Sequence, residues 1–148
     1  MAWPETTADG LPIAQEPPFV ACVVVHRERA GQLEVLLLHR AASGPEYEGE
    51  WAWTPPAGSR FPGEDIDICA ARELTEETSL TLAIARVGAV TEACIVYRAQ
   101  AGGDSAVILD AEHDRFEWVG AEEAMRRCRP AIVAEEIRAA LDAIAAMR

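Results

Sequence analysis

The sequence predicts an α/β fold: an α/β/α sandwich in which a mixed β-sheet carries one helix on each face. The apolar, β-branched run Phe19–His26 is typical of a buried strand. Strand-like runs stand on both sides of a central helical segment, about residues 64–79. A closing helix has an apolar stripe at helical spacing: Val133, Ile137, Ala140, Leu141 and Ile144. Strands before and after one helix, with a second helix at the end, favour a sheet that is covered on both faces.

The chain before the central helix is expected to form a hairpin and an extended approach. The expected turn, second strand, polar loop and short aromatic strand are Arg27–Gln32, Leu33–Arg40, Ala41–Glu50 and Trp51–Thr54. Pro55-Pro56 then stops any helix and fixes an extended backbone toward Gly58.

The central helix is expected to begin near Glu64 or Asp65 and to end around Thr78-Ser79, because Pro62-Gly63 precedes it and acids fill its first turn. The remaining chain is predicted to alternate strands and turns and to end in helices. The predicted elements are a strand from Thr81 to Ala99 bent near Gly88, a hairpin loop Gln100–Asp104, strands Ser105–Asp110 and Phe116–Val119, a short helix Gly120–Cys128, and a helix from Pro130 to Ala146.

The length of 148 residues corresponds to about one domain. Residues 1–18 contain four prolines and no hydrophobic period, so they are predicted to be a flexible N-terminal arm. Residues 19–148 are predicted to be the folded domain.

The composition limits the partners and the compartment. A formal net charge of −12 argues against a nucleic-acid duplex or an anionic membrane as the main partner. An anionic substrate must therefore be attracted by local arginines or by metal ions. The four scattered cysteines have no metal-ligand spacing, and no apolar run approaches the roughly 20 residues of a membrane span. These features predict a cytoplasmic protein.

Three carboxylates of the central helix form an unusual cluster. Glu73, Glu76 and Glu77 stand at i, i+3 and i+4, so they share one helix face. That face continues the apolar stripe of Cys69 and Ala70, and it lies near the helix end, where the macrodipole favours cations. A bound divalent cation would remove both the mutual repulsion and the unfavourable dipole. An exposed acidic helix face is the alternative.

The spacing around these glutamates resembles the Nudix box, G-x5-E-x7-RE-U-x-EE-x-G-U, in which U is a bulky aliphatic residue. The matching residues are Gly58, Glu64, Arg72, Glu73, Leu74, Glu76, Glu77 and Leu80, and Ser79 replaces the last glycine. The resemblance implies a Nudix hydrolase in which the box helix covers one face of the sheet and the C-terminal helix the other.

The resemblance also implies a metal site and its support. It assigns Mg²⁺, with Mn²⁺ as a substitute, to Glu73, Glu76, Glu77 and the carbonyl of Gly58. Hard carboxylate oxygens suit Mg²⁺, which takes the rest of its shell from water and phosphates. Because their charges are opposite, Glu64 and Arg72 are expected to form a supporting salt bridge and not to act in catalysis.

The proton acceptor of the implied reaction has three candidates. Glu76 and Glu77 lie on the helix, and Glu112 lies on a distant loop. The stretch Leu109–Val119 resembles a segment of dinucleoside tetraphosphate hydrolases and dihydroneopterin triphosphate pyrophosphatases, in which a Glu-His pair precedes a tryptophan. An exposed acidic loop is the alternative for Glu112.

Four residues are candidates for contact with the substrate. Trp51 and Trp53 could stack on a base, although core packing explains either one equally well. Arg40 and Arg60 could pair with phosphates, although exposed arginines are common.

The leading hypothesis is magnesium-dependent hydrolysis of a phosphoanhydride in a nucleoside diphosphate linked to another group. A dinucleoside polyphosphate or nucleoside triphosphate is the favoured substrate. The first alternative is ADP-ribose or a nucleoside diphosphate sugar, and the second is a Nudix-fold ligand-sensing module without turnover. The resemblance also allows a homodimer.

Overall fold

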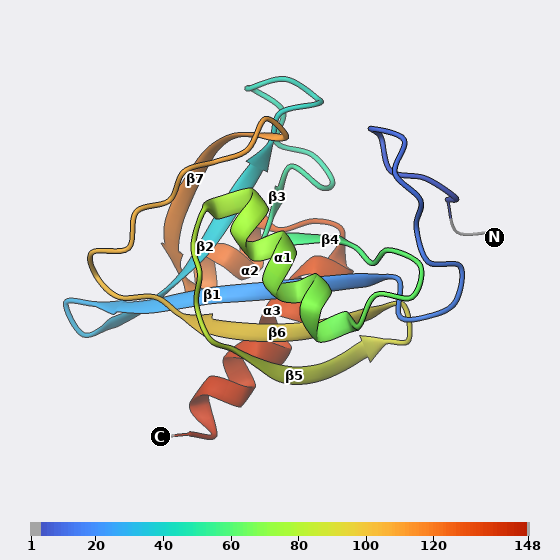
Figure 1. The fold of residues 1–148 in the computed structure, drawn as a ribbon. Helices are drawn as coiled ribbons and strands as arrows, with labels where there is room; N and C mark the ends of the chain where they lie inside the picture. Colours follow the sequence, from blue (N-terminus) through green and yellow to red (C-terminus); the bar gives the residue numbers. More distant parts are fainter. Residues whose placement is uncertain (1–3, 148) are drawn as a thin grey trace.

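A mixed, seven-stranded sheet forms the centre of the computed structural model, which describes residues 4–147 (Figure 1). Strand β1 (Val20–Arg29) pairs antiparallel with β2 (Gln32–Arg40) and parallel with β6 (Cys94–Gln100). The path through the sheet is β3-β2-β1-β6-β5, with β4 beside β1 and β7 beside β2. The other strands are β3 (Trp53–Thr54), β4 (Ala57–Ser59), β5 (Ile84–Thr91) and β7 (His113–Gly120).

Helices cover both faces of this sheet, which confirms the predicted fold class. Helix α1 (Ile66–Thr78) lies in front of the sheet in Figure 1, whereas α2 (Ala121–Arg127) and α3 (Ala131–Ala145) lie behind it. No helix within residues 4–147 is long and apolar enough to cross a membrane.

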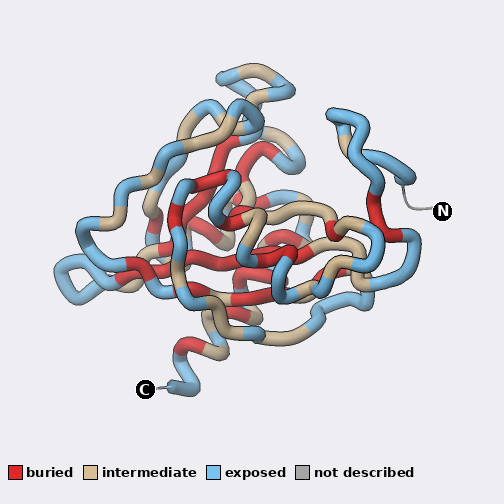
Figure 2. The backbone as a smooth tube through the Cα atoms, viewed as in Figure 1, coloured by how far each residue is buried: buried red, intermediate tan, exposed pale blue. Residues whose placement is uncertain are grey.

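The alternation of side chains along β1 divides the core into two layers. Ala21, Val23 and Val25 belong to a cluster on the α1 side, which includes Leu36, Leu38, Cys69, Leu74 and Tyr97. Cys22 and Val24 belong to a cluster on the α2/α3 side, which includes Leu37, Trp53, Val119, Val133 and Ile137. The buried segments of Figure 2 follow these central strands and the inner sides of the helices.

Helix α1 begins and ends close to its predicted bounds. Asp65 is the N-cap, and its carboxylate accepts hydrogen bonds from the backbone N–H groups of Asp67 and Ile68, at 2.8 and 3.3 Å. Ser79 closes the helix in the left-handed conformation, with φ 62° and ψ 13°. That conformation costs a non-glycine residue about 1 kcal/mol or more. The Ser79 hydroxyl donates a 3.0 Å hydrogen bond to the Ile108 carbonyl, which offsets part of this cost.

The predicted strand Ser105–Asp110 is wrong. This segment has no strand partner among the described residues, and the end of α1 takes up its backbone groups instead. The N–H of Ile108 donates to the carbonyl of Thr78 at 2.9 Å, and the carbonyl of Ile108 accepts from Ser79. The last carbonyls of a helix lack intrahelical partners, so an extended segment alongside can satisfy them without joining a sheet.

The predicted long strand Thr81–Ala99 is two strands. Strands β5 and β6 are separated at Glu92-Ala93, and the pairing register shifts between Arg86 and Gly88. Gly88 has φ 142° and therefore bends the strand without breaking it.

The N-terminal arm contacts the domain through part of its length. Ile13 and Ala14 are buried, and the N–H of Ala14 donates to the carbonyl of Arg60 at 2.8 Å. Figure 2 shows this buried stretch within an otherwise exposed arm. Residues 1–3 of the predicted arm lie outside the described part of the chain.

Candidate active site

The three glutamates of α1 differ in exposure because the helix turns them to different depths. Glu77 lies on the buried stripe and is 2% exposed, Glu73 is half-buried, and Glu76 faces solvent. A spacing of 3.6 residues per turn places Glu73 and Glu77 one above the other. The helix therefore presents a buried pair of carboxyl groups beside one exposed carboxylate.

Strand β4 brings the backbone of Gly58 against this pair. A Cβ atom at Gly58 would lie 2.0 Å from Cδ of Glu73, so only glycine allows this approach. The N–H of Ala57 donates to Glu77 Oε1 at 3.3 Å. Ala21 of β1 pairs with Gly58, which fixes β4 to the centre of the sheet.

Arg72 connects the helix to the loop that precedes it. Its Nε and Nη2 donate to the two carboxylate oxygens of Glu64, each at 2.9 Å. Nη2 also donates to the carbonyl of Ser59 at 3.0 Å, and the guanidinium stacks 4.0 Å from the ring centre of Phe61. The hydrogen bond from Arg72 lowers the pKa of Glu64. This bidentate pair is the predicted support for the box, and it fixes the loop against the helix.

The Arg72 guanidinium lies near two of the three glutamates of α1, Glu73 and Glu76. Arg72 Nη1 donates to Glu73 Oε1 at 2.8 Å and lies 3.4 Å from both Glu76 carboxylate oxygens. Burial raises the pKa of Glu77 well above its ordinary value. A hydrogen bond with Glu73 and the negative charge of Glu73 raise this pKa further. Burial also raises the pKa of Glu73. A cation bound here would displace the proton that the raised pKa of Glu77 favours.

Asp110, on the loop before β7, and His113, the first residue of β7, complete the surroundings of Glu77. His113 Nε2 lies 3.8 Å from Glu77 Oε1, and His113 Nδ1 donates to Asp110 Oδ1 at 2.8 Å. The negative charge of Asp110 contributes to the raised pKa of Glu77. The sequence alone assigned neither residue to the site. Their position depends on how β7 pairs with β2, which the local sequence does not show.

Glu112 and Arg40 lie at the edge of this arrangement. Glu112 is exposed, it precedes His113, and its carbonyl accepts a 2.9 Å hydrogen bond from the N–H of Ala41. Arg40 is exposed and pairs with His113 across β2 and β7. Both residues are thus near the part of β7 that approaches Glu77.

The structure separates Trp53 and Arg60 from this group. Trp53 is 2% exposed and packs in the cluster on the α2/α3 side, so its ring faces are not available for stacking on a base. Arg60 is 7% exposed, and its guanidinium donates to the carbonyls of Pro18, Glu16 and Glu64 at 2.7, 2.7 and 3.1 Å. Contact of Arg60 with a phosphate would require these bonds to break. Trp51 is 43% exposed, and its N–H donates to the carbonyl of Arg129.

Phe116 is an exposed aromatic residue that sequence reasoning placed only in a strand. It is 37% exposed and pairs with Leu38, whose side chain belongs to the cluster on the α1 side. Directly paired residues point to the same face of a sheet, so Phe116 lies on the face that carries the glutamates. Side chains alternate between the two faces along a strand, so Phe116, three residues before the buried Val119, could have been assigned to the opposite face from the sequence.

The donor set suits a hard divalent cation. Among residues 4–147, no three histidine, cysteine, aspartate or glutamate side chains already converge as a closed metal cage. Mg²⁺ does not require one, because it keeps several waters and binds few protein carboxylates. Glu73, Glu76 and Glu77 offer carboxylate oxygens on one helix, and burial raises the pKa of Glu73 and of Glu77, an effect that a bound cation would oppose.

The fold and this acidic helix define a Nudix-type α/β/α protein, and comparison with known families agrees. A model of the NUDIX domain matches residues 16–141. The chain belongs to the Nudix family, whose members are typically pyrophosphohydrolases and usually use a divalent metal ion.

Solved structures show the same fold. An Ap4A hydrolase of C. elegans, in a binary complex, is 27% identical with a TM-score of 0.66, covering 86% of this chain and 97% of that one. The dihydroneopterin triphosphate pyrophosphohydrolase of E. coli is 17% identical with a TM-score of 0.62, covering 81% and 92%. At that identity the second likeness shows the fold alone.

One curated relative is a much longer protein. An octanoyltransferase of Myxococcus xanthus is 32% identical in an alignment of 135 positions that covers 82% of this chain and 36% of that protein. The chain thus spans about a third of that relative's length, and the activity in its name belongs to the whole protein.

Replacing Glu77 by glutamine is expected to separate metal binding from folding. The folded-state pKa of Glu77 is raised, so without metal the stability of the parent should fall as the pH rises above about 4.3, the unperturbed value for glutamate. Glu77→Gln should reduce this slope. Free Mg²⁺ at about ten times its dissociation constant should stabilise the parent by about 1.4 kcal/mol, or about 3–6 °C in Tm, and the variant much less.

Thermal unfolding between pH 5 and pH 8, in EDTA and in Mg²⁺, measures both effects. Glu122→Gln, which changes an exposed glutamate of α2, is the matched control and should behave as the parent. An equal Mg²⁺-induced rise in Tm for the Glu77 variant would contradict the metal assignment.

Proposed function

We propose that the protein catalyses magnesium-dependent hydrolysis of a phosphoanhydride bond in a nucleoside diphosphate linked to another group. The favoured substrate is a dinucleoside polyphosphate or a nucleoside triphosphate. Water attacks phosphorus and a phosphate oxygen leaves, so the products are two phosphorylated fragments.

The observation that carries this proposal is the buried pair Glu73 and Glu77 beside the backbone of Gly58. Burying carboxylates with so little positive charge around them is costly. Arg72 donates a hydrogen bond to Glu73, and Nε2 of His113 lies 3.8 Å from Oε1 of Glu77. A cation that arrives with the substrate would relieve this cost.

The relatives support a nucleotide substrate. The C. elegans structure bears the name of an Ap4A hydrolase and aligns along nearly its whole length. Among the hypotheses from the sequence, ADP-ribose remains the enzymatic alternative. A ligand-sensing module is disfavoured because Glu73, Glu76 and Glu77 are all present.

Glu73, Glu76, Glu77 and the carbonyl of Gly58 would hold the metal. When bound, Mg²⁺ supplies positive charge to the polyphosphate and makes water more acidic. Within the chain, Arg72 bonds to Glu64 and to the carbonyl of Ser59, and these bonds hold α1 at a fixed separation from β4. Asp110 orients the ring of His113, which faces Glu77. These residues position the carboxylates without changing chemically.

The proton of the attacking water passes to a carboxylate, for which we favour Glu112. Glu77 is buried, and it would be occupied as a ligand. Glu76 is exposed, but its two carboxylate oxygens lie 3.4 Å from Arg72 Nη1, which donates to them. Glu112 is exposed on the loop beside His113, and its side chain forms no ion pair with an arginine within residues 4–147.

The substrate would extend from the glutamates across the exposed part of β2 and β7. Arg40 can reach a phosphate with a planar guanidinium, and Phe116 presents an aromatic ring on the same face of the sheet. Trp51 is exposed, but its backbone contact with Arg129 places it beside the α2–α3 connection.

Assay of a substrate panel tests the proposed reaction. With Mg²⁺, dinucleoside polyphosphates or nucleoside triphosphates should be hydrolysed faster than ADP-ribose, with ¹⁸O from labelled water appearing in one product. Glu77→Gln should lower kcat at least about 100-fold, because a metal-binding charge is lost. Faster turnover of ADP-ribose would favour the first alternative, and ligand binding without turnover would favour the sensing module.

Glu112→Gln tests the proton acceptor. General base catalysis typically contributes about 10²–10⁴-fold, so kcat should fall within that range while the Mg²⁺-induced rise in Tm persists. Glu92→Gln, an exposed glutamate between β5 and β6, is the control. If Glu112→Gln has the same kcat as the parent, Glu112 is not the proton acceptor, and Glu76 or Glu77 takes that role.

Phe116→Ala tests the substrate surface. If a base stacks on this ring, KM should rise by a factor that corresponds to about 1–3 kcal/mol, with kcat nearly unchanged. Phe116→Trp should restore binding. Ile68→Ala removes an apolar side chain on α1 that is more exposed than Phe116, and it should leave KM unchanged. An unaltered KM for Phe116→Ala would place the base elsewhere.

A further inference from the structure

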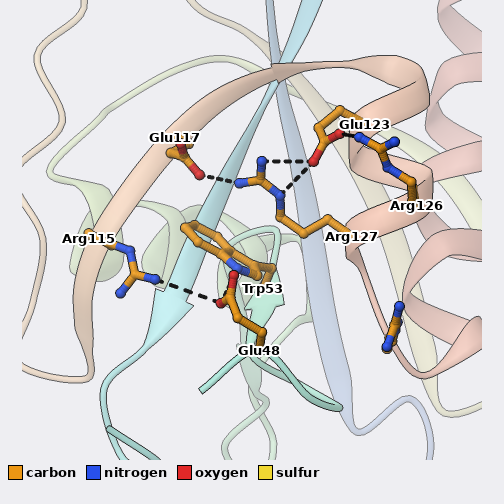
Figure 3. Close-up of a pocket in the computed structure, with 8 residues that line it drawn as sticks. Glu48, Trp53, Arg115, Glu117, Glu123, Arg126 and Arg127 are labelled. Atoms are coloured by element: carbon orange, nitrogen blue, oxygen red, sulfur yellow. Dashed lines mark hydrogen bonds and ion pairs between the residues drawn. The ribbon is translucent and has the colours of Figure 1, made fainter. Parts of the chain in front are cut away.

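A cavity of about 610 Å³ lies between β7, the loop before β3, helix α2 and the α2–α3 connection (Figure 3). Its volume is that of a small-molecule site. Charged residues dominate the lining: Glu48, Trp53, Arg115, Glu117, Glu123, Arg126, Arg127 and Arg129.

This cavity is on the opposite face of the sheet from the glutamates of α1. Trp53 and Val119 belong to the cluster on the α2/α3 side, and Glu117 alternates in phase with Val119 along β7. Phe116, one residue away, points to the α1 side. A ligand here would therefore occupy a site separate from the candidate active site, and its binding does not rest on the proposed hydrolysis.

The cavity is a local exception in the charge of the chain. The whole chain has a formal net charge of −12 with 13 basic residues, all of them arginine. Four of those arginines line this one cavity, beside three glutamates, which leaves one formal positive charge. Arginines gathered from a strand, a helix and a connection indicate attraction of an anion.

Two of the arginines are held in place by the protein. Arg127 Nε and Nη2 donate to Glu123 Oε2 at 3.0 and 2.8 Å, and Arg127 also pairs with Glu117. Figure 3 shows its guanidinium between these two glutamates. Arg115 donates to the carbonyl of Pro45 at 2.6 Å. Both guanidiniums lie near Trp53, 4.9 and 5.1 Å from its ring centre, so they form a rigid wall.

The other two arginines are available to a ligand. The side chain of Arg126 is 77% exposed and shares Glu123 with Arg127, so one carboxylate serves two guanidiniums. No ion pair or hydrogen bond of the Arg129 guanidinium is found within residues 4–147. The carbonyl of Arg129 accepts from the N–H of Trp51 at 2.6 Å, which fixes its backbone. A bound anion would accept hydrogen bonds from the guanidinium N–H groups of Arg126 and Arg129 that the glutamates leave without an acceptor.

We propose that this cavity binds a small molecule bearing phosphate groups, through Arg126 and Arg129. Guanidinium groups match phosphate oxygens in bidentate geometry, and a group with two or more negative charges can compete with the resident carboxylates. Trp53 is buried beneath the arginines and offers no free face, so the site recognises charge and not a base.

Inorganic pyrophosphate in EDTA is the probe, followed by NMR of the ¹⁵N-labelled protein. The indole N–H of Trp53 reports on this cavity, because it donates at 2.9 Å to Glu48, which lines it. Pyrophosphate should shift the Trp53 indole signal saturably, and succinate should shift it much less. Arg126→Gln with Arg129→Gln should weaken binding at least about tenfold, because charged hydrogen bonds are lost, while the rate of hydrolysis stays parental.

Arg138→Gln, an exposed arginine of α3, controls for the loss of charge and should not weaken binding. Arg40→Gln controls for binding on the other face of the sheet and should leave the Trp53 shift intact. The proposal is overturned if pyrophosphate does not move the Trp53 signal, or if the double variant binds as the parent does. Equal responses to succinate and pyrophosphate would also overturn it.

Discussion

The placement of Glu77 beside Glu73 on the buried stripe of α1 is the constraint on which the candidate site depends. Folding the helix against the sheet removes one carboxyl group almost completely from water and brings a second one next to it. Neighbouring features follow from this. Gly58 has no side chain because the Glu73 carboxyl group occupies that space. Arg72 supplies charge from one side, and His113 faces Glu77 from the other. A protein selected only for stability would have an apolar residue at position 77, since a buried carboxyl group weakens the fold.

Sequence reasoning reached the parts of the fold that local periodicity determines. The continuous apolar run of β1, the helical period of α3 and the order of strands and helices predicted a sheet covered on both faces, and the fixed spacing from Gly58 to Leu80 predicted the acidic helix. It failed where the outcome depends on distant partners. The segment 105–110 has a strand-like composition, yet its backbone bonds to the end of α1. Arg60 resembles a free phosphate ligand until the carbonyls of the N-terminal arm are in place around it. Asp110, His113 and Phe116 acquire their positions from the register of β7 against β2, which no local pattern encodes.

The two faces of the sheet treat charge differently. On the α1 side, carboxylates are buried with little compensation, so that face is suited to cations. On the α2/α3 side, arginines outnumber glutamates around one cavity, so that face is suited to anions. Strand β7 serves both faces, because alternate residues along it point to opposite sides. Phe116 belongs to the acidic side, and Arg115 and Glu117 line the basic cavity. A register shift in the pairing between His39 and Arg40 interrupts the alternation, and His113 faces Glu77 on the acidic side. A change in the register of this one strand would disturb both sites together.

Ser79, the one position that departs from the Nudix box, has a mechanical consequence. Glycine could adopt the left-handed turn at the end of α1 more easily, but it has no hydroxyl group. Serine donates to the carbonyl of Ile108, and Ile108 is two residues before Asp110. The departure thus joins the helix that carries Glu77 to the loop that carries Asp110 and leads into β7 at His113. Together with the hydrogen bond from the Ile108 N–H to the Thr78 carbonyl, this bond lets the protein itself set the spacing between the helix end and the loop.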